Sequence, residues 1–449
     1  MSVFKTYDIR GVWGREIDET LAYRVGRALA RYVKARTWLV GHDARLHSAE
    51  LYRAVCAGLL DEGAKPTGMG LVSTPLLHYA QIQRSFDAGI MVTASHNPPE
   101  YHGFKAFDSS GGSLSYEKGL KDVEAIVAAM GGEGAAPRAA ARRSFPEIDC
   151  LEAYVDFIAS RAPGLKFDGR IVIDISNGSA GKVFRRLSQK LGIEAALLNA
   201  DPDGRFPNHD PNPLKEESRR QAAEAVVAGG ARFGVVLDGD GDRILFVDEK
   251  GRGIENYFLA CLVAEELLSR SPGSAIVYDL ISSRVLPERI AELGGRPVVS
   301  RVGYTFLYDG MVAEGAAFGA ETSGHVYFKV TDRYYTESAA YALVVLLQLL
   351  AERRKPLSEL VEPLRERYVQ SPEINVEVPD KAKAIAEIER RYAAGRIDRL
   401  DGVSIAFEDY WFNVRASNTE PLLRLRLEAR TREVALARTA EIQALLAQR

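Results

Sequence analysis

Three aspartates alternate with glycines in a short acidic segment, DGDGDR. Asp238, Asp240 and Asp242 stand two residues apart, and the glycines let the backbone bend so that the carboxylates can converge on one cation. Carboxylate oxygens are hard ligands that suit Mg²⁺ or Ca²⁺ rather than Zn²⁺. A solvated acidic hairpin turn is the plainer interpretation and stays open, whereas Arg243 stands where an EF-hand needs glycine. An arginine at this place favours a site that also handles anions.

A serine follows an apolar run in a second segment, TASHNPPEYHGFK at 93–105. The Asn-Pro-Pro run within it is turn chemistry, so a plain turn is the default interpretation of Ser95. A serine hydroxyl needs a base, a metal or a prior modification before it reacts, and no G-x-S-x-G elbow is present. A phosphorylated Ser95 beside a magnesium site would act as phosphoryl donor and acceptor. Lys105 is either an acid or base for that reaction or a surface lysine, and the sequence alone favours the surface.

Two further segments offer polar side chains for a sugar phosphate. In GAETSGHVYF the residues Glu321, Ser323 and His325 alternate, and a carboxylate with a hydroxyl can bind vicinal sugar hydroxyls, although a polar loop between strands is the simpler interpretation. In RASNTEP the donors that suit a phosphate are Arg415, Ser417, Asn418 and Thr419. A turn closed by the following proline explains the same residues without any ligand.

Strand and helix signals alternate around these segments. Helical spacing occurs at 21–35, 49–64 and 338–354, and apolar strand-like runs precede the serine and flank the aspartates. A stretch rich in glycine and alanine at 130–143 suggests a domain edge, and KPLSELVEPL at 355–364 suggests a linker. The order of elements predicts three α/β units of similar size followed by a smaller α+β unit.

Composition narrows the functional class. The chain has 449 residues, which predicts several domains, and a net charge of -3, which gives no basic footprint for nucleic acid and no polybasic membrane patch. The three cysteines are far apart in the sequence and fit a reducing compartment. No apolar run approaches the roughly 20 residues that span a bilayer. We therefore expect a cytoplasmic protein.

Taken together and in this order, TASHNP, DGDGDR, GAETSGH and SNTEP resemble the α-D-phosphohexomutase family, and most closely its bacterial phosphomannomutase/phosphoglucomutase branch. The resemblance runs from YDIRG at 7–11 to the RASNTEPLLRLRLE segment. It implies three similar α/β domains with mixed sheets and a smaller C-terminal α+β domain, arranged around a central cleft. The expected domains are 1–145 with the phosphoserine, 146–252 with the metal, 253–368 for sugar recognition and 369–449 for phosphate binding.

The resemblance also implies roles for individual residues. Ser95 matches the phosphoserine, and a phosphoryl oxygen on it completes a Mg²⁺ site formed by Asp238, Asp240 and Asp242. Lys105, Arg10 and His325 match positions near the reacting groups, and Lys105 is the favoured general acid/base. The positions expected to bind substrate are Tyr7, Arg243, Glu321, Ser323, Arg415, Ser417, Asn418 and Thr419.

The implied activity is an isomerase that interconverts hexose 1-phosphate and hexose 6-phosphate of mannose, glucose or both. Phospho-Ser95 donates its phosphoryl group, a hexose 1,6-bisphosphate intermediate turns over in the cleft, and Ser95 takes back the other group. One Mg²⁺ per chain is expected, with the bisphosphate as activator. The expected partners are small sugar phosphates, with no nucleic acid and no membrane, and the chain is expected to be a monomer rather than an oligomer.

The sequence departs from the family pattern at three places, and the first two, which lie among the sugar-phosphate contacts, put the preferred sugar in doubt. Ile281 stands where a lysine is usual, Tyr304 where a histidine is usual, and the segment 336–338 reads Thr-Glu-Ser in place of Asp-Asp-Gly. Phosphoglucosamine mutase is an alternative within the family, although its usual QSGH and SGTE motifs are absent. A phosphotransferase that releases hexose 1,6-bisphosphate and a non-catalytic cation-binding module are alternatives of other classes.

Overall fold

The computed structural model describes residues 2–131, 143–416 and 422–447. It has an α/β fold with three mixed sheets and a C-terminal part built on an antiparallel sheet, which confirms the expected fold class. The chain divides into two compact units, the first formed by Met1–Asn256 and Ser323–Ser358 and the second by Tyr257–Thr322 and Glu359–Arg449. Among the helices in the described ranges, none has the length and apolar character that a bilayer crossing requires.

The first sheet of the first unit has the strand order β1-β5-β4-β2-β3, in which β2 pairs in parallel with β3 and β4 while β5 runs antiparallel to β1 and β4. Its strands are β1 (Ile9–Val12), β2 (Thr37–His42), β3 (Lys65–Leu71), β4 (Ala88–Val92) and β5 (Tyr101–Phe107). The helical elements of this part are α1 (Glu19–Val33), α2 (Ser48–Asp61), α3 (Thr74–Gln83), the π-helical turn η1 (Tyr116–Leu120) and α4 (Lys121–Ala129).

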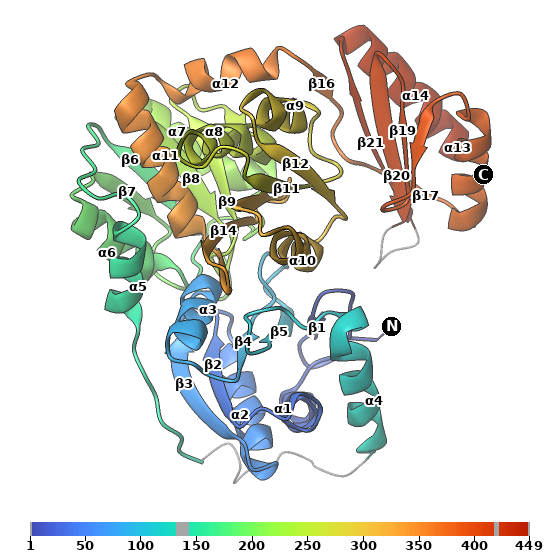
Figure 1. Ribbon diagram of the computed structural model, residues 1–449. Helices are drawn as coiled ribbons and strands as arrows, with labels where there is room; N and C mark the ends of the chain where they lie inside the picture. The colour runs from blue at the N-terminus through green and yellow to red at the C-terminus, as the bar shows by residue number, and fades with distance from the viewer. Residues whose placement is uncertain (1, 132–142, 417–421, 448–449) are drawn as a thin grey trace. The chain divides into compact units, whose positions relative to one another are not determined.

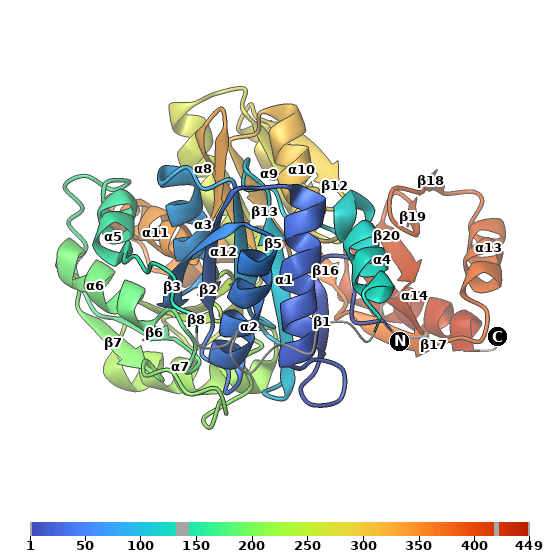
Figure 2. The ribbon, with the colours of Figure 1, turned by 90° about the horizontal axis from the view of Figure 1, so that it is seen from below.

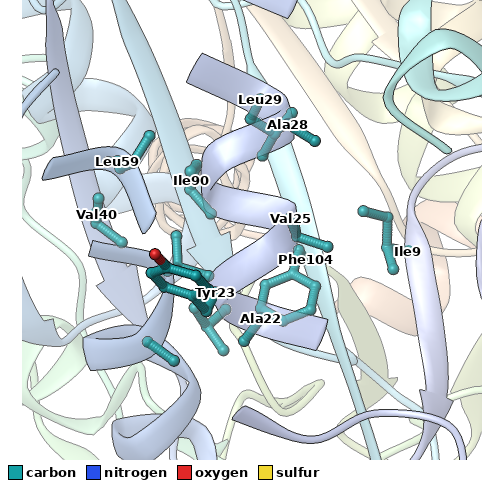
Figure 3. Close-up of a cluster of buried hydrophobic side chains, with 14 of the residues drawn as sticks. Ile9, Ala22, Tyr23, Val25, Ala28, Leu29, Val40, Leu59, Ile90 and Phe104 are labelled. Carbon is teal, nitrogen blue, oxygen red and sulfur yellow. The ribbon is translucent and has the colours of Figure 1, made fainter. Parts of the chain in front are cut away.

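Helices α1 and α2 lie side by side against one face of this sheet (Figures 1 and 2). The Asp18 side chain caps the N-terminus of α1 by accepting from the Leu21 amide at 2.7 Å. Alternate residues of the strands face the helices, so that Ile90 of β4 and Phe104 of β5 join Val25 of α1 in one apolar core (Figure 3). The opposite face of the same strands is therefore left for other groups.

The second sheet of the first unit has the order β10-β9-β8-β6-β7, with β6 parallel to β7 and β8 and with β9 antiparallel to β8 and β10. Its strands are β6 (Ile171–Asp174), β7 (Ala195–Leu198), β8 (Phe233–Leu237), β9 (Ile244–Asp248) and β10 (Gly253–Ile254). The helices of this part are α5 (Leu151–Ala159), α6 (Gly181–Leu191) and α7 (Glu216–Gly229). The three inner strands, β9, β8 and β6, are buried along their whole length, as a strand covered on both faces must be.

The third mixed sheet contains β11 (Ala275–Asp279), β12 (Arg296–Ser300), β13 (Phe318–Ala320), β14 (Val326–Thr331) and β15 (Tyr334–Glu337). In the first unit, β14 and β15 form an antiparallel hairpin. In the second unit, β11 pairs in parallel with β12 and β13. The helices of this region are α8 (Asn256–Arg270), α9 (Val285–Glu292), α10 (Tyr304–Glu314), α11 (Ala339–Arg353) and α12 (Leu357–Arg365).

The interpretation of 355–364 as a linker is wrong, because most of it is helix α12. Leu357, Val361 and Leu364 are buried at the i, i+4 and i+7 spacing of one helix face. Pro356 directly precedes the first helical residue, a place that proline tolerates because the missing N–H would have no partner there. The prolines at 356 and 363 favoured a linker over a helix, so the helical spacing of these apolar residues was missed.

The C-terminal part of the second unit is an antiparallel sheet with the order β16-β21-β20-β19-β18, and β17 also pairs with β21. Its strands are β16 (Val369–Gln370), β17 (Ile374–Glu377), β18 (Arg396–Asp398), β19 (Val403–Ala406), β20 (Tyr410–Ala416) and β21 (Leu422–Ala429). Helices α13 (Lys381–Arg391) and α14 (Arg432–Ala447) contribute Ile388 and Ile442 to the core of this part. This arrangement matches the smaller α+β unit that the sequence predicts.

Candidate active site

Ser95 lies in a turn just beyond the end of β4, and the residue itself is completely buried. Its backbone has a φ of 51°, the left-handed region that residues other than glycine rarely occupy. The Thr93 hydroxyl accepts from the Ser95 amide at 2.8 Å and donates to Asp43 at 2.8 Å, which holds this conformation. The Ser95 hydroxyl donates to Asp238 at 2.6 Å. Strain of this kind persists only where the surroundings enforce it, and it is common at functional sites.

A buried arginine organises the loop that carries Ser95. The Arg45 guanidinium donates to four backbone carbonyls of this loop, those of Ser95 at 2.8 Å, Asn97 at 2.5 Å, Pro98 at 2.6 Å and Tyr101 at 2.9 Å. Burial lowers the pKa of Arg45, and the adjacent Asp43 carboxylate opposes that effect at 3.2 Å. Arg45 was not among the predicted site residues, because its partners are backbone groups about fifty positions further along the chain.

The acidic segment connects β8 to β9 in a tight loop. Asp238 Oδ1 accepts from the amides of Gly241, Asp242 and Arg243 at 3.0, 3.2 and 3.2 Å. Gly241 has a φ of 74°, and a Cβ on Gly239 would lie 2.7 Å from the carbonyl oxygen of Ser95. Glycine is therefore required at one position for the turn and at the other for the approach of the serine loop. The simple solvated hairpin is excluded, because all three aspartate side chains are buried.

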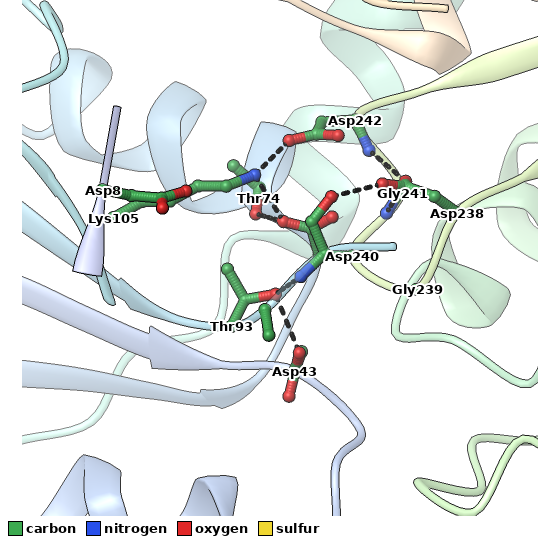
Figure 4. Close-up of polar contacts among 12 residues, drawn as sticks. Asp8, Asp43, Thr74, Thr93, Lys105, Asp238, Gly239, Asp240, Gly241 and Asp242 are labelled. Atoms are coloured by element: carbon green, nitrogen blue, oxygen red, sulfur yellow. Dashed lines mark hydrogen bonds and ion pairs between the residues drawn. The ribbon is translucent and has the colours of Figure 1, made fainter. Parts of the chain in front are cut away.

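Lys105 reaches the aspartates from β5, as Figure 4 shows. Phe104 and Ala106 face the apolar core, so the alternation of the strand directs Lys105 to the opposite face. Its ammonium donates to Asp240 at 2.8 Å and also contacts Asp242. The surface interpretation of Lys105 is wrong, since the residue is only 2% exposed. The strand β5 lies between β1 and β4 inside the sheet, which explains the burial.

Burial and neighbouring charges shift the pKa values of two of the three aspartates in opposite directions. Burial raises the pKa of Asp238 well above its usual range, and the carboxylates of Asp242 and Asp240 raise it further. Burial acts on Asp240 as well, but the Lys105 ammonium and hydrogen bonds from Lys105 and Thr74 outweigh it and lower the pKa of Asp240. Asp242 Oδ1 is buried and has no hydrogen-bond partner among the described residues. One carboxylate oxygen of each aspartate lies within 4.8 Å of the others, so these residues fit a divalent cation with oxygen ligands.

His325 lies beside the aspartate loop. The residue precedes β14 and forms a backbone bridge with Arg243, and the Ile244 amide donates to the Gly324 carbonyl at 3.2 Å. Its Nδ1 atom contacts the Glu337 carboxylate and lies 3.8 Å from Asp242 Oδ1. All of these residues belong to the first unit. The structure therefore brings His325 together with the cluster, as the predicted site requires.

Glu337 was not predicted from the sequence as a functional residue. It is 6% exposed, and burial raises its pKa well above the usual range of a carboxyl, with the Asp242 carboxylate adding to the effect. The one sequence signal at this position was the departure from Asp-Asp-Gly at 336–338, and that departure alone assigned no role to Glu337.

Two predicted residues, Arg10 and Arg243, and one that was not predicted, His96, lie near Ser95. The Arg10 guanidinium binds Asp8 at 2.7 Å and the Ala94 carbonyl at 3.1 Å, and it contacts the Asn97 side chain. His96 Nδ1 lies 3.3 Å from the serine oxygen, and burial together with Arg243 and Arg10 lowers the pKa of this histidine well below 6.5. Arg243 Nε lies 3.9 Å from Asp238. These arginines place positive charge beside the position that a phosphoryl group on Ser95 would occupy.

The remaining predicted residues are less completely defined. Tyr7 is half-buried two residues before β1, and Ser323 is half-buried in the loop before β14. In the second unit, Glu321 is buried and accepts from the Gly303 amide at 2.6 Å, while Arg415 on β20 pairs with Glu373 at 2.6 Å. Ser417, Asn418 and Thr419 lie outside the described residues.

Comparison with known proteins agrees with this architecture along the whole chain. Four family models described as phosphoglucomutase/phosphomannomutase match it: α/β/α domain I at residues 1–131, domain II at 148–251, domain III at 255–368 and the C-terminal domain at 373–445. The chain belongs to the phosphoglucomutase/phosphomannomutase family. This membership confirms the resemblance seen in the four motifs. The exact domain boundaries expected from the sequence stay predictions.

Individual relatives cover the chain almost completely. A phosphomannomutase of Salmonella typhimurium is 37% identical over 458 residues, which cover 100% of this chain and 99% of the relative. A phosphomannomutase of Methanocaldococcus jannaschii is 36% identical and covers 100% of this chain and 98% of the relative. A solved structure of a phosphoglucomutase/phosphomannomutase family protein from Burkholderia thailandensis matches with a TM-score of 0.89 and 31% identity, covering 99% of this chain and 97% of that chain.

Proposed function

We propose that this family member is a phosphohexomutase that interconverts hexose 1-phosphate and hexose 6-phosphate through a phosphoserine at position 95. The observation that carries the proposal is the 2.6 Å hydrogen bond from the Ser95 hydroxyl to Asp238, within a buried cluster of three aspartates that also binds Lys105. This serine is buried and strained, contacts a cluster that fits a divalent cation, and has arginines nearby. These features suit it to carry a phosphoryl group. Membership of a mutase family supports the reaction type.

The proposed reaction has two phosphoryl transfers. A free sugar hydroxyl oxygen attacks the phosphorus of phospho-Ser95, the bond between phosphorus and the serine oxygen breaks, and the hydroxyl proton passes to a base. Lys105 and His325 are the proposed acid and base groups, and protonation of the serine oxygen completes the transfer. The bisphosphate then turns over, and the second phosphate is transferred back to Ser95 by the same steps in reverse.

The aspartate cluster fits one Mg²⁺ per chain, held by Asp238, Asp240, Asp242 and a phosphoryl oxygen on Ser95. A bound Mg²⁺ would neutralise the charge that develops on the transferring group. The residues of the chain have separate tasks: Arg10 and Arg243 attract the phosphoryl oxygens, and the Arg45 hydrogen bonds fix the serine loop.

The residues that we propose for sugar recognition are those implied by the family pattern. Glu321 and Ser323 bind the hydroxyl groups at C3 and C4, which mannose and glucose share, and the non-reacting phosphate is bound by Arg415, Ser417, Asn418 and Thr419. Tyr7 completes the set. Because mannose and glucose differ only at C2, this site has little means of distinguishing them. We propose that the enzyme acts on both as a monomer, with hexose 1,6-bisphosphate as intermediate and activator.

The test is a substrate panel with a matched Ser95→Ala variant. With Mg²⁺ and a trace of bisphosphate, kcat/KM for mannose 1-phosphate and glucose 1-phosphate should agree within about tenfold, since one altered hydrogen bond costs roughly 0.5–1.5 kcal/mol. Peptide mapping after incubation with bisphosphate should locate one phosphate on Ser95. Ser95→Ala should lose about 10³-fold or more of the activity, because the covalent route disappears.

Three results would contradict parts of this proposal. Turnover by Ser95→Ala, or label on another residue, would exclude the phosphoserine route. A strong preference for glucosamine 1-phosphate would identify a phosphoglucosamine mutase instead. Net accumulation of free bisphosphate as the main product would identify a phosphotransferase rather than an isomerase.

A further inference from the structure

The hairpin formed by β14 and β15 positions a carboxylate against His325. Glu337 ends β15 and pairs with Tyr327 of β14, two residues beyond His325. Residues two apart on a strand share a face, so His325 and Glu337 form a diagonal pair across the hairpin, within reach of a long side chain. The structure shows the result, a contact between the Glu337 carboxylate and Nδ1 of the histidine.

This pair is almost entirely shielded from water. The side chains of His325 and Glu337 are 2% and 8% exposed, and Tyr327 supplies a further hydrogen bond to the carboxylate. Hydrogen bonds from two sides fix the carboxylate, so its position is set before any substrate binds. When the Glu337 carboxyl is ionised, it accepts the Nδ1–H hydrogen bond of the histidine, and Nε2 is then the acceptor.

We infer that Glu337 is the positioning residue for His325: it sets the ring orientation and the tautomer with which that histidine exchanges a proton with the sugar hydroxyl. The inference rests on the proposed mutase function. Glu337 accepts the Nδ1–H hydrogen bond, while Nε2 takes the hydroxyl proton as the oxygen attacks phosphorus and returns it in the reverse transfer. No proton is transferred to Glu337, which acts only through the histidine. The arrangement is analogous to the orienting carboxylate of a hydrolase triad.

The same residues permit one other interpretation. Asp242, His325 and Glu337 each have a ligand atom within 4.8 Å of the others, which is also compatible with a second cation site. We favour the positioning role because the hydrogen-bonding needs of His325 Nδ1 are already met by Glu337, whereas ligation would require Nδ1 to lose its proton. Counting the bound metal distinguishes the two interpretations.

The experiment compares Glu337→Gln, Glu337→Asp, His325→Ala and the double variant Glu337→Gln/His325→Ala. Glu337→Gln should lower kcat for glucose 1-phosphate about 10- to 10³-fold and change KM less than about threefold, because the amide can present the wrong group to Nδ1. Glu337→Asp, which keeps the charge, should recover part of that loss. The double variant should be no slower than His325→Ala alone, since two residues that act as a unit are not additive.

A matched control removes a buried carboxylate at the far end of β9, the strand that follows the aspartate loop. Asp248 ends β9, is completely buried and binds Arg252 at 2.9 Å. Asp248→Asn should lower the melting temperature but leave kcat unchanged. This control therefore measures the cost of losing a buried charge that has no part in the reaction.

Three outcomes would decide against the inference. Additive losses in the double variant would show that Glu337 and His325 act independently. Equal losses in Glu337→Gln and Glu337→Asp would remove the positioning role, and a second metal ion per chain in the wild type, lost in Glu337→Gln, would establish a cation site. Failure of the wild type to turn over any hexose phosphate would contradict the proposed function instead, which keeps the two failures distinct.

Discussion

Two loops meet at the proposed reaction centre, and opposite charges organise them. The loop after β4 surrounds a buried cation, with four backbone carbonyls directed at Arg45. The loop between β8 and β9 surrounds a buried anion, with three backbone amides directed at Asp238 Oδ1. A short irregular loop has no ladder for its polar backbone groups, so one charged side chain satisfies several of them at once.

The difference between the loops lies in how many tasks each central residue has. Arg45 contacts the loop backbone and Asp43, and its role is structural. Asp238 uses Oδ1 for the loop and Oδ2 for the Ser95 hydroxyl, so one side chain is both structural and reactive. In the second loop, we therefore expect that only a substitution of Asp238 that keeps an oxygen for the loop amides can lower activity without lowering stability.

Of the contacts that organise these two loops, those of Asp238 are expected to show the largest effect when they are removed. Asp238→Asn keeps an oxygen for the three amides but loses the charge, so kcat should fall about 10²- to 10³-fold while stability in chelator stays within about 1 kcal/mol of wild type. Asp238→Ala should lose the same activity and also several kcal/mol of stability, because each stranded buried amide costs about 1–3 kcal/mol.

Urea unfolding in the presence of a chelator and steady-state assays in Mg²⁺ measure the two quantities separately. Equal destabilisation by Asn and Ala would show that the three amide hydrogen bonds do not hold this loop. Full activity of Asp238→Asn would remove the carboxylate from the reaction and weaken the case for the cation site.

The next effect is expected from Arg45, where the loss should be mainly structural. Arg45→Met leaves Asp43 as an unpaired buried charge, which costs about 3–5 kcal/mol. Arg45→Lys keeps the charge but offers three donors for four carbonyls, so we expect a loss of about 1–3 kcal/mol. With the loop relaxed, kcat should also fall about tenfold, because Ser95 no longer keeps its strained backbone.

Thermal unfolding and the rate of Ser95 phosphorylation by bisphosphate test this expectation. If Arg45→Met does not fold, the same measurements on Arg45→Lys still test it. Wild-type stability with a large loss of activity in Arg45→Lys would contradict the structural role and indicate that this arginine contacts the phosphoryl group.

The same comparison explains what the sequence could predict. The aspartates and Ser95 stand in compact motifs whose residue types and spacing indicate chemistry, and the structure brings them together. Arg45 has no such motif, because its partners are carbonyls that any sequence would supply. Its role depends on the path of a loop that is distant in the sequence, and only the folded backbone shows it.

Lys105 and Glu337 show a second limit of sequence reasoning. The alternation around Lys105 indicates that it faces away from the apolar core, but whether that face meets solvent or another part of the protein depends on the strand order. Glu337 reaches His325 through the register of a hairpin, and a shift of one residue would turn it to the other face. Strand order and register are long-range properties that periodicity alone does not determine.

The smallest effect concerns the contact that ties the aspartate loop to the N-terminus of α3. The Thr74 amide donates to the Asp240 carbonyl at 3.0 Å, and its hydroxyl donates to the Asp240 carboxylate at 2.6 Å. Thr74→Val removes only the hydroxyl bond and keeps the shape of the side chain. Because Lys105 still binds that carboxylate oxygen at 2.8 Å, the charge stays compensated, and we expect a loss of about 1 kcal/mol in stability.

The corresponding loss in kcat/KM should be about three- to fivefold, since 1.36 kcal/mol corresponds to a factor of ten. Thr74→Ser, which restores a hydroxyl, should recover most of both quantities in parallel chemical-unfolding and steady-state measurements. A loss of activity as large as that of Asp238→Asn would show that Thr74 takes part in the reaction. No change in either quantity would show that α3 holds this loop only through the backbone hydrogen bond from the Thr74 amide to the Asp240 carbonyl.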